Sequence, residues 1–154
     1  ALWAVPVIFA TAIVAYALSL VVSEVPDSPL PATGETTGFV LQLVAGALIA
    51  PFGEELLFRG LATTAWVRDL GVGRGVLRAA LVFAFAHVIG VTGVTAGAAA
   101  AAAGVAFAAR VPVALALGWL FVRRGSLWAS FGLHAAFNGI LLILAEAALR
   151  SGVG

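Results

Sequence analysis

The segment FVLQLVAGALIAPFGEELLFRGLATTAW, residues 39–66, decides the fold class of this chain. It is long enough to cross a bilayer core of about 30 Å, which needs roughly 20 helical residues. It nevertheless contains Glu54, Glu55 and Arg59. A charged group at the centre of a membrane helix costs on the order of 2.5–3.5 kcal/mol and usually marks function. The segment therefore predicts a membrane helix that carries a functional site.

The composition supports a membrane location for the whole chain. Of 154 residues, 63% are hydrophobic and 10% charged, and the mean hydropathy is +1.15. Soluble domains carry roughly 45–50% apolar and about 25% charged residues, so this chain has too little polar surface for water. The absence of cysteine excludes disulfide frameworks, thiolate metal sites and cysteine nucleophiles. A net charge of +1 excludes a polybasic nucleic-acid surface.

Four further apolar segments complete the predicted set of spans: residues 2–22, 76–91, 105–122 and 126–149. In lipid, only helices and closed barrels satisfy the backbone, and no segment has the alternation of a strand. We predict an all-α, polytopic transmembrane helix bundle of about five spans, forming one domain over residues 1–154. The Gly/Ala-rich segment 92–104 fits a surface helix, a re-entrant piece or the start of the next span.

The placement of arginine predicts the orientation. Positive residues that flank spans stay in the cytoplasm, and alternation through five spans puts the loops 67–75 and 123–125 on that side. The acidic loop 23–38 falls on the other side. The lysine-free, Ala/Arg/Gly/Val-rich composition is typical of a GC-rich prokaryotic genome. We therefore expect an integral protein of a prokaryotic plasma membrane, and its start at Ala1 without any methionine suggests a chain trimmed from a larger bundle.

Polar residues gather at one predicted depth in three spans. Glu54 lies twelve residues before Trp66, His87 twelve after Gly75, and His134 nine after Gly125. At about 1.5 Å per residue these positions are roughly 13–18 Å from the cytoplasmic loops. We expect them to meet in one layer and, with Glu55 and Arg59, to be the buried ionisable groups.

Spacing within the second span separates two acids. Glu55 and Arg59 stand at i and i+4, in the order that favours an intrahelical ion pair. Glu54 points about 100° away from Glu55 and is free to face the bundle interior. A partly desolvated carboxylate can act as a general base. Glu54 is thus the candidate base, whereas Glu55 and Arg59 would fix the geometry of the span.

The other two spans supply the remaining groups. Phe83 and His87 share one helical face, so the phenyl ring can wall a pocket beside the imidazole. His134 and Asn138 also share a face and can hold a developing oxyanion. Our hypothesis is peptide hydrolysis, in which Glu54 and His87 activate water while His134 and Asn138 stabilise the tetrahedral intermediate.

Three alternatives remain open from the residues. Glu54, His87 and His134 also make a His₂Glu set with one open position, as in catalytic zinc sites, so zinc is the alternative cofactor to a metal-free mechanism. A non-enzymatic membrane scaffold or immunity partner would keep the cavity and act by binding. A proton or ion pathway would use the same buried acids and histidines.

The three motifs also occur in the order of a known family. EExxxR stands at residues 54–59, FxxxH at 83–87 and HxxxN at 134–138, with the lead-in RGSLW at 124–128. In this the chain resembles the CPBP family of CAAX proteases and bacteriocin-processing enzymes, also called the Abi family of intramembrane endopeptidases. The resemblance implies the all-helical fold of the type II CAAX prenyl endopeptidases, with the catalytic core at about 39–149.

The same resemblance implies roles and partners. The first Glu of EExxxR and the His of FxxxH, here Glu54 and His87, would activate water in a cavity open to the cytosol. His134 and Asn138 would bind the oxyanion. The expected partners are the bilayer and a peptide or membrane-protein substrate, in processing or in bacteriocin self-immunity; the oligomeric state stays open. The family commonly has seven or eight spans, which fits a trimmed chain.

Overall fold

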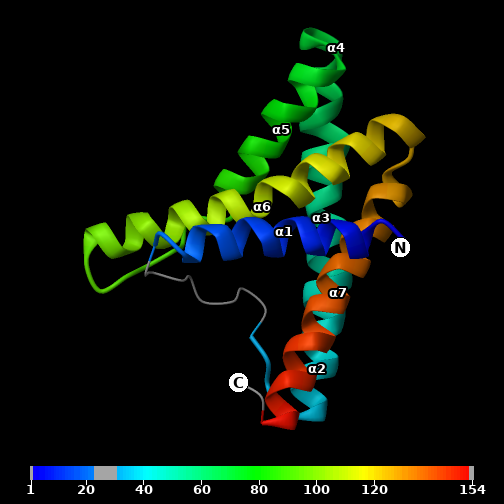
Figure 1. Cartoon of the computed structure of the whole chain (residues 1–154). Helices are drawn as coiled ribbons and strands as arrows, with labels where there is room; N and C mark the ends of the chain where they lie inside the picture. Colours follow the sequence, from blue (N-terminus) through cyan, green and yellow to red (C-terminus); the bar gives the residue numbers. More distant parts are fainter. Residues whose placement is uncertain (1, 23–30, 153–154) are drawn as a thin grey trace.

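The structure, a computed structural model, describes residues 2–22 and 31–152, and in these ranges the chain forms five helices and no strand. They are α1 (Ala4–Ser19), a long helix from Thr36 to Leu70, α5 (Val72–Ala86), α6 (Ala96–Arg124) and α7 (Leu127–Ser151) (Figure 1). The predicted all-α helix bundle is confirmed.

The long helix changes its winding before the EExxxR motif and again within it. It consists of α2 (Thr36–Gln42), the π-helical segment η1 (Leu43–Ile49), α3 (Ala50–Glu55), the π-helical segment η2 (Leu56–Thr63) and α4 (Thr64–Leu70). Pro51 has no N–H to donate to the preceding turn, which η1 accommodates. Where η2 meets α4, the hydroxyls of Thr63 and Thr64 donate to the carbonyls of Phe58 and Arg59, five residues back, at 2.7 and 3.0 Å. π-helical turns are frequent at functional sites.

Three of the helices are long and apolar enough to cross a membrane: Thr36–Leu70, Ala96–Arg124 and Leu127–Ser151. The predicted extents of the other two spans, 2–22 and 76–91, were wrong. α1 ends at Ser19 and α5 at Ala86, and their 16 and 15 residues fall short of the roughly 20 a span needs. The chain leaves α5 at the segment that contains Gly90 and Gly93, whose glycines disfavour helix. Part of the predicted acidic loop, residues 23–30, lies outside the described residues.

The segment 92–104 proves to be the start of the next span. Thr95 has extended backbone angles, and its Oγ1 accepts a hydrogen bond from the Ala98 N–H at 3.1 Å, which caps the first turn of α6. The helix then continues through Ala96–Gly104 without interruption. It ends at Arg124 and is followed by Gly125, whose φ of 59° is left-handed, a conformation that favours glycine.

α6 is the centre of the bundle and packs against α1, α5 and α7. α1 runs antiparallel beside it, while the long helix and α7 cross this pair (Figure 1). One apolar cluster joins α1, α6 and α7 around Leu117, Leu133 and Phe137. A second cluster, with Phe58, Phe83 and Ala114 among its members, joins η2, α5 and α6.

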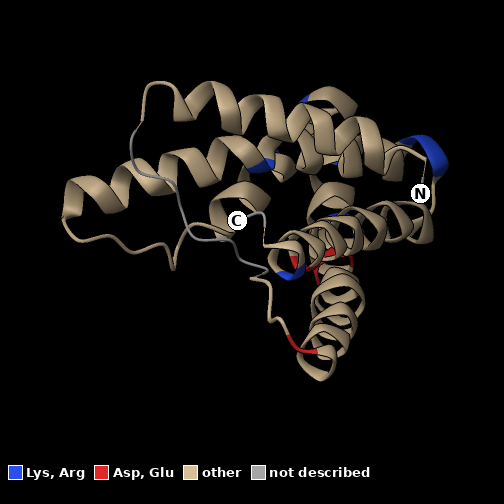
Figure 2. Ribbon diagram, turned by 60° about the horizontal axis from the view of Figure 1, so that its bottom comes forward, with Lys and Arg blue, Asp and Glu red and all other residues tan. Residues whose placement is uncertain are grey.

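Polarity is distributed as a bilayer requires. Large apolar side chains face outward, among them Phe9, Ile13 and Leu61, each about two-thirds exposed. The polar residues buried in the described chain are Glu55, Arg59, Thr63, Ser130, His134 and Glu146. Figure 2 shows how few charges the ribbon carries. Burial of Glu146 was not predicted.

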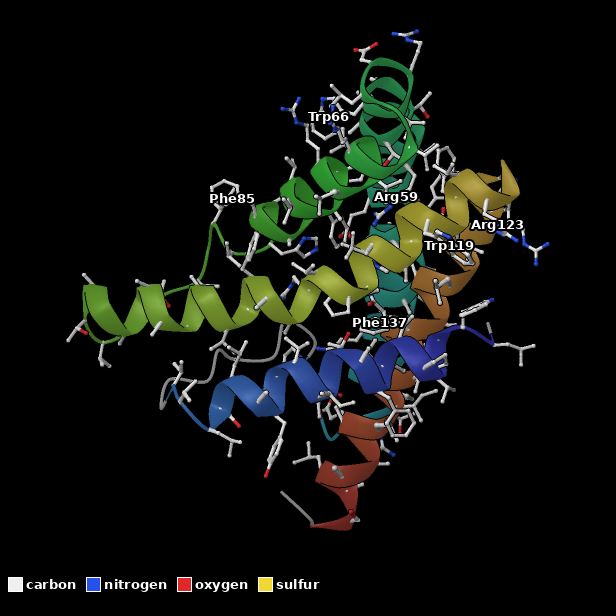
Figure 3. The ribbon with its side chains drawn as sticks, turned by 45° about the horizontal axis from the view of Figure 1, so that its top comes forward. Arg59, Trp66, Phe85, Trp119, Arg123 and Phe137 are labelled. Carbon is white, nitrogen blue, oxygen red and sulfur yellow. The ribbon has the colours of Figure 1, made fainter. Side chains whose placement is uncertain are left out.

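The Arg-rich connections lie at one end of the bundle. Val72, at the start of α5, lines the same hollow as Arg123 and Arg124, and Trp3 lies there too. Figure 3 shows Trp119 and Arg123 together at this end of α6. At the other end, the Glu146 carboxylate accepts hydrogen bonds from the Thr33 and Gly34 amides at 2.9 and 3.3 Å. The predicted separation of arginine loops from the acidic loop therefore agrees with the chain path.

Candidate active site

The Glu55 carboxylate is fully buried and accepts two hydrogen bonds on one oxygen. Its Oε1 accepts from Arg59 Nη1 at 3.0 Å, the predicted i, i+4 ion pair. The same Oε1 lies 2.8 Å from Nδ1 of His134 on α7. Because the carboxylate oxygen accepts, His134 Nδ1 is the donor, and Nε2 is left for the interior. Glu55 therefore orients a histidine on another helix, a role that spacing within its own helix could not reveal.

Arg59 anchors this arrangement to two further helices. Its Nη2 donates to the Ala114 carbonyl of α6 at 3.4 Å. Its guanidinium carbon lies 4.5 Å from the centre of the Phe83 ring of α5. Figure 3 places Arg59 where the long helix passes behind α6. Arg59 is 2% exposed, and these contacts give its charge the compensation that burial demands.

His87 sits at the point where α5 ends. Its Nδ1 lies 2.8 Å from the Phe83 carbonyl, one of the last carbonyls of the helix, which lack backbone partners. The carbonyl can only accept, so Nδ1 carries the hydrogen and Nε2 is free. The Phe83 and His87 rings lie 4.4 Å apart, as their shared helical face predicted.

Glu54 lies between the two free imidazole nitrogens. Its Oε2 is 3.5 Å from His87 Nε2 and 3.7 Å from His134 Nε2. Glu54 and His87 are each about a quarter to a third exposed, whereas His134 is buried. Three helices thus bring these groups to one level, which confirms the predicted layer.

Asn138 is held by the first π-helical segment. Its Nδ2 donates to the Gly46 carbonyl in η1 at 2.8 Å. An amide nitrogen carries two hydrogens, so the second remains available. The contact ties α7 to the long helix one turn of α7 beyond His134.

A cavity of about 380 Å³ joins these groups. Glu54, His87, His134 and Asn138 all line it, and Phe83 forms part of its wall. Glu55 and Arg59 do not line it and stand behind it. The residues proposed to act on a substrate therefore all line one cavity, together with Phe83, whereas Glu55 and Arg59 lie outside its lining.

The alternative zinc set does not fit the observed placement. Within the described residues, no group of three or more His, Asp or Glu side chains has the geometry to hold a metal ion. The contacts of His134 Nδ1 and His87 Nδ1 with oxygen acceptors leave both Nε2 atoms free, so the fit is decided by the placement of the three side chains and not by these hydrogen bonds.

Sequence reasoning missed two ionisable residues inside the helices. Arg110 of α6 lines the cavity, which its position in the sequence did not predict. Glu146 of α7 binds the segment before α2 and also accepts from Arg150 Nε at 2.8 Å. Both carried the signal of a charge within a span, whereas nothing in the sequence singled out the Gly46 carbonyl.

Comparison with protein families identifies the family of this chain. The family model described as type II CAAX prenyl endopeptidase Rce1-like matches residues 36–140, more than half of the chain. The chain belongs to this family. The match contains all three motifs, and the Rce1-like family is one of proteases. Together with the three long apolar helices, this makes the protein an integral membrane protein. No curated protein and no solved structure gave a significant match.

Proposed function

We propose that this Rce1-like protein is an intramembrane endopeptidase that hydrolyses a peptide bond with water activated by Glu54 and His87. The observation that supports this most directly is the cavity in which Glu54 Oε2 faces two imidazole Nε2 atoms at 3.5 and 3.7 Å. Because Glu54 Oε2 and His87 Nε2 are 3.5 Å apart, one water oxygen could lie about 2.8 Å from both atoms. Such a water would have two bases beside it.

The reaction then follows ordinary amide hydrolysis. The water gives a proton to the Glu54–His87 pair, and its oxygen bonds to the carbonyl carbon. When the intermediate collapses, the C–N bond breaks and the same proton passes to the leaving nitrogen. The products are one peptide with a new carboxyl group and one with a new amine.

His134 and Asn138 would stabilise the oxyanion. Asn138 Nδ2 has one hydrogen left after its bond to Gly46. Because His134 Nδ1 donates to Glu55, a second donor at Nε2 makes His134 an imidazolium whose charge faces the Glu55 carboxylate. This resembles the way in which a buried acid supports the histidine of a serine protease triad. Removing one oxyanion donor typically lowers kcat about 10²–10³-fold.

The setting of the reaction is part of the proposal. The Arg-rich end of the bundle would face the cytoplasm, and the membrane would be a prokaryotic plasma membrane. The substrate would be a peptide or membrane protein, in processing or in bacteriocin self-immunity. A scaffold or immunity partner that binds without cleaving is the competing function, and it would not need Glu54 and His87 as bases.

Peptidomics of cells that carry the wild-type protein or Glu54→Gln tests the proposal. We expect wild-type-dependent fragments that disappear in Glu54→Gln, while Glu35→Gln, which alters an exposed acid outside the cavity, keeps them. Both variants should unfold at wild-type temperature in detergent. A fully active Glu54→Gln protein would overturn the assignment.

The same purified protein decides the question of zinc. We expect turnover to survive chelation and the metal content to be below one zinc per chain. Stoichiometric zinc whose removal abolishes cleavage would replace the metal-free mechanism.

A further inference from the structure

Arg110 is a cation in the catalytic cavity that the proposed reaction does not use. It lies on α6, one turn before Ala114, whose carbonyl binds Arg59. Its side chain is half-buried and lines the same cavity as Glu54, His87, His134 and Asn138. A ligand that reaches the reacting groups therefore meets a guanidinium as well.

The hydrogen bonds of Arg110 leave most of its donors available. Nη1 donates to the Ala106 carbonyl of its own helix at 3.1 Å. Among the described residues no carboxylate lies within ion-pair distance of Arg110, whereas Arg59 and Arg150 each have one. A guanidinium has five N–H groups in a planar fork.

A cation without an ion-pair partner among the described residues is costly within a membrane-spanning helix and is usually retained for function. The cost falls when an anion enters the cavity. A carboxylate matches the guanidinium best, because two parallel N–H···O bonds form at once and each is strengthened by charge. The neighbouring walls of the cavity, such as Val113 and Leu141, are apolar. The imidazolium proposed for His134 is engaged with the oxyanion, so Arg110 is the cation left for a substrate carboxylate.

We propose that Arg110 binds a carboxylate of the peptide substrate and so selects peptides that carry one near the scissile bond. The carboxylate is either the C-terminus of the peptide or an acidic side chain. This inference rests on the proposed protease function, since it names the substrate class for the same cavity.

A second role for Arg110 would be electrostatic balance of Glu54 across the cavity. The two roles make different predictions. A substrate-binding arginine changes KM for peptides with a carboxylate and leaves peptides without one unaffected. An arginine that acts through Glu54 changes kcat for every peptide alike.

The test uses the whole protein in liposomes and a library of apolar decapeptides, each made as a C-terminal acid and as a C-terminal amide. A second pair of libraries, both amidated, carries one internal Asp or one internal Asn. Wild-type protein is compared with Arg110→Gln, Arg110→Lys and the control Arg124→Gln, which removes an exposed arginine outside the cavity. Binding of the same libraries to Glu54→Gln protein is measured in parallel, with and without Arg110→Gln.

We expect wild-type protein to favour one carboxylate library over its neutral counterpart by at least about tenfold in kcat/KM. Arg110→Gln should abolish this preference through KM, Arg110→Lys should keep part of it, and Arg124→Gln should keep all of it. The pair of peptide libraries for which wild-type protein shows this preference identifies the carboxylate as the C-terminus or as an acidic side chain.

Several results would overturn the inference. They are equal cleavage of acid and neutral peptides by wild-type protein, an unchanged preference in Arg110→Gln, or a uniform fall in kcat. If Arg110→Gln lowers cleavage only in liposomes that contain phosphatidylglycerol, Arg110 binds lipid headgroups instead. If no peptide is cleaved, the protease function fails, while binding to Glu54→Gln protein still decides whether Arg110 selects carboxylates.

Discussion

At the scale of single residues, the Glu55 carboxylate makes one contact that its position in the sequence does not indicate. Its Oε1 accepts from Arg59 within the long helix and from His134 on α7. The i, i+4 spacing predicts the first contact and is silent about the second. Glu55 therefore stabilises the buried Arg59 and orients a proposed oxyanion donor at the same time.

Replacing Glu55 separates these two effects. Glu55→Gln leaves Arg59 buried without its acid, and breaking such a pair costs about 3–5 kcal/mol. The double variant Glu55→Gln/Arg59→Met removes both charges and should recover most of this stability. It should not recover turnover, because His134 still lacks its carboxylate. Thermal unfolding in detergent and kcat measure the two effects, and wild-type turnover in the double variant would contradict the role given to Glu55.

At the scale of elements, the close approach of α4 and α5 depends on Gly75. A Cβ added at Gly75 would lie 2.5 Å from the Val67 backbone nitrogen, and backbone atoms cannot give way as side chains do. Gly73, in the same turn of α5, has nothing within 4 Å of such a Cβ. The two glycines are thus a matched pair on one helix.

We expect Gly75→Ala to destabilise the protein by about 1–3 kcal/mol through overpacking. Gly73→Ala should be neutral or slightly stabilising, since alanine favours helix. Unfolding temperatures in the same detergent compare them. Equal stability of the two variants would show that α4 and α5 can separate without loss. Because α5 carries His87, Gly75→Ala should also lower turnover.

At the scale of the whole molecule, the chain path sets both arginine connections at one end. Val72 and the pair Arg123 and Arg124 line one hollow there, and the Glu146 contacts lie at the other end. On the positive-inside rule, we propose that this end faces the cytoplasm.

The absence of native cysteine makes this orientation measurable. Gly73→Cys and Gly125→Cys should be shielded from an impermeant maleimide added outside intact cells, whereas Glu35→Cys should be labelled. All three should react after permeabilisation, which controls for burial. Labelling of Gly73→Cys from outside would invert the proposed topology.

Much of the candidate site is predictable from helical spacing and from counts of residues along each span. Helical spacing predicts the Glu55–Arg59 pair and the shared faces of Phe83 with His87 and of His134 with Asn138. Counting residues from the loops predicts that Glu54, His87 and His134 share a level. These inferences hold because rise and rotation per residue are constant within a helix. The extents of α1 and α5 were less predictable, since apolar composition does not stop where a helix does.

The sequence by itself determined the membrane setting, the helical fold class and the motif residues, because hydropathy and helical geometry are local properties. Only the tertiary structure decided the partners that lie far apart in the chain. These are the Glu55–His134 bond, the Asn138–Gly46 bond and the place of Arg110 in the cavity. The reason is physical: rotation of each helix about its axis and its crossing angle are set by packing of whole faces. No local pattern encodes which carbonyl or carboxylate a polar group will meet on another helix.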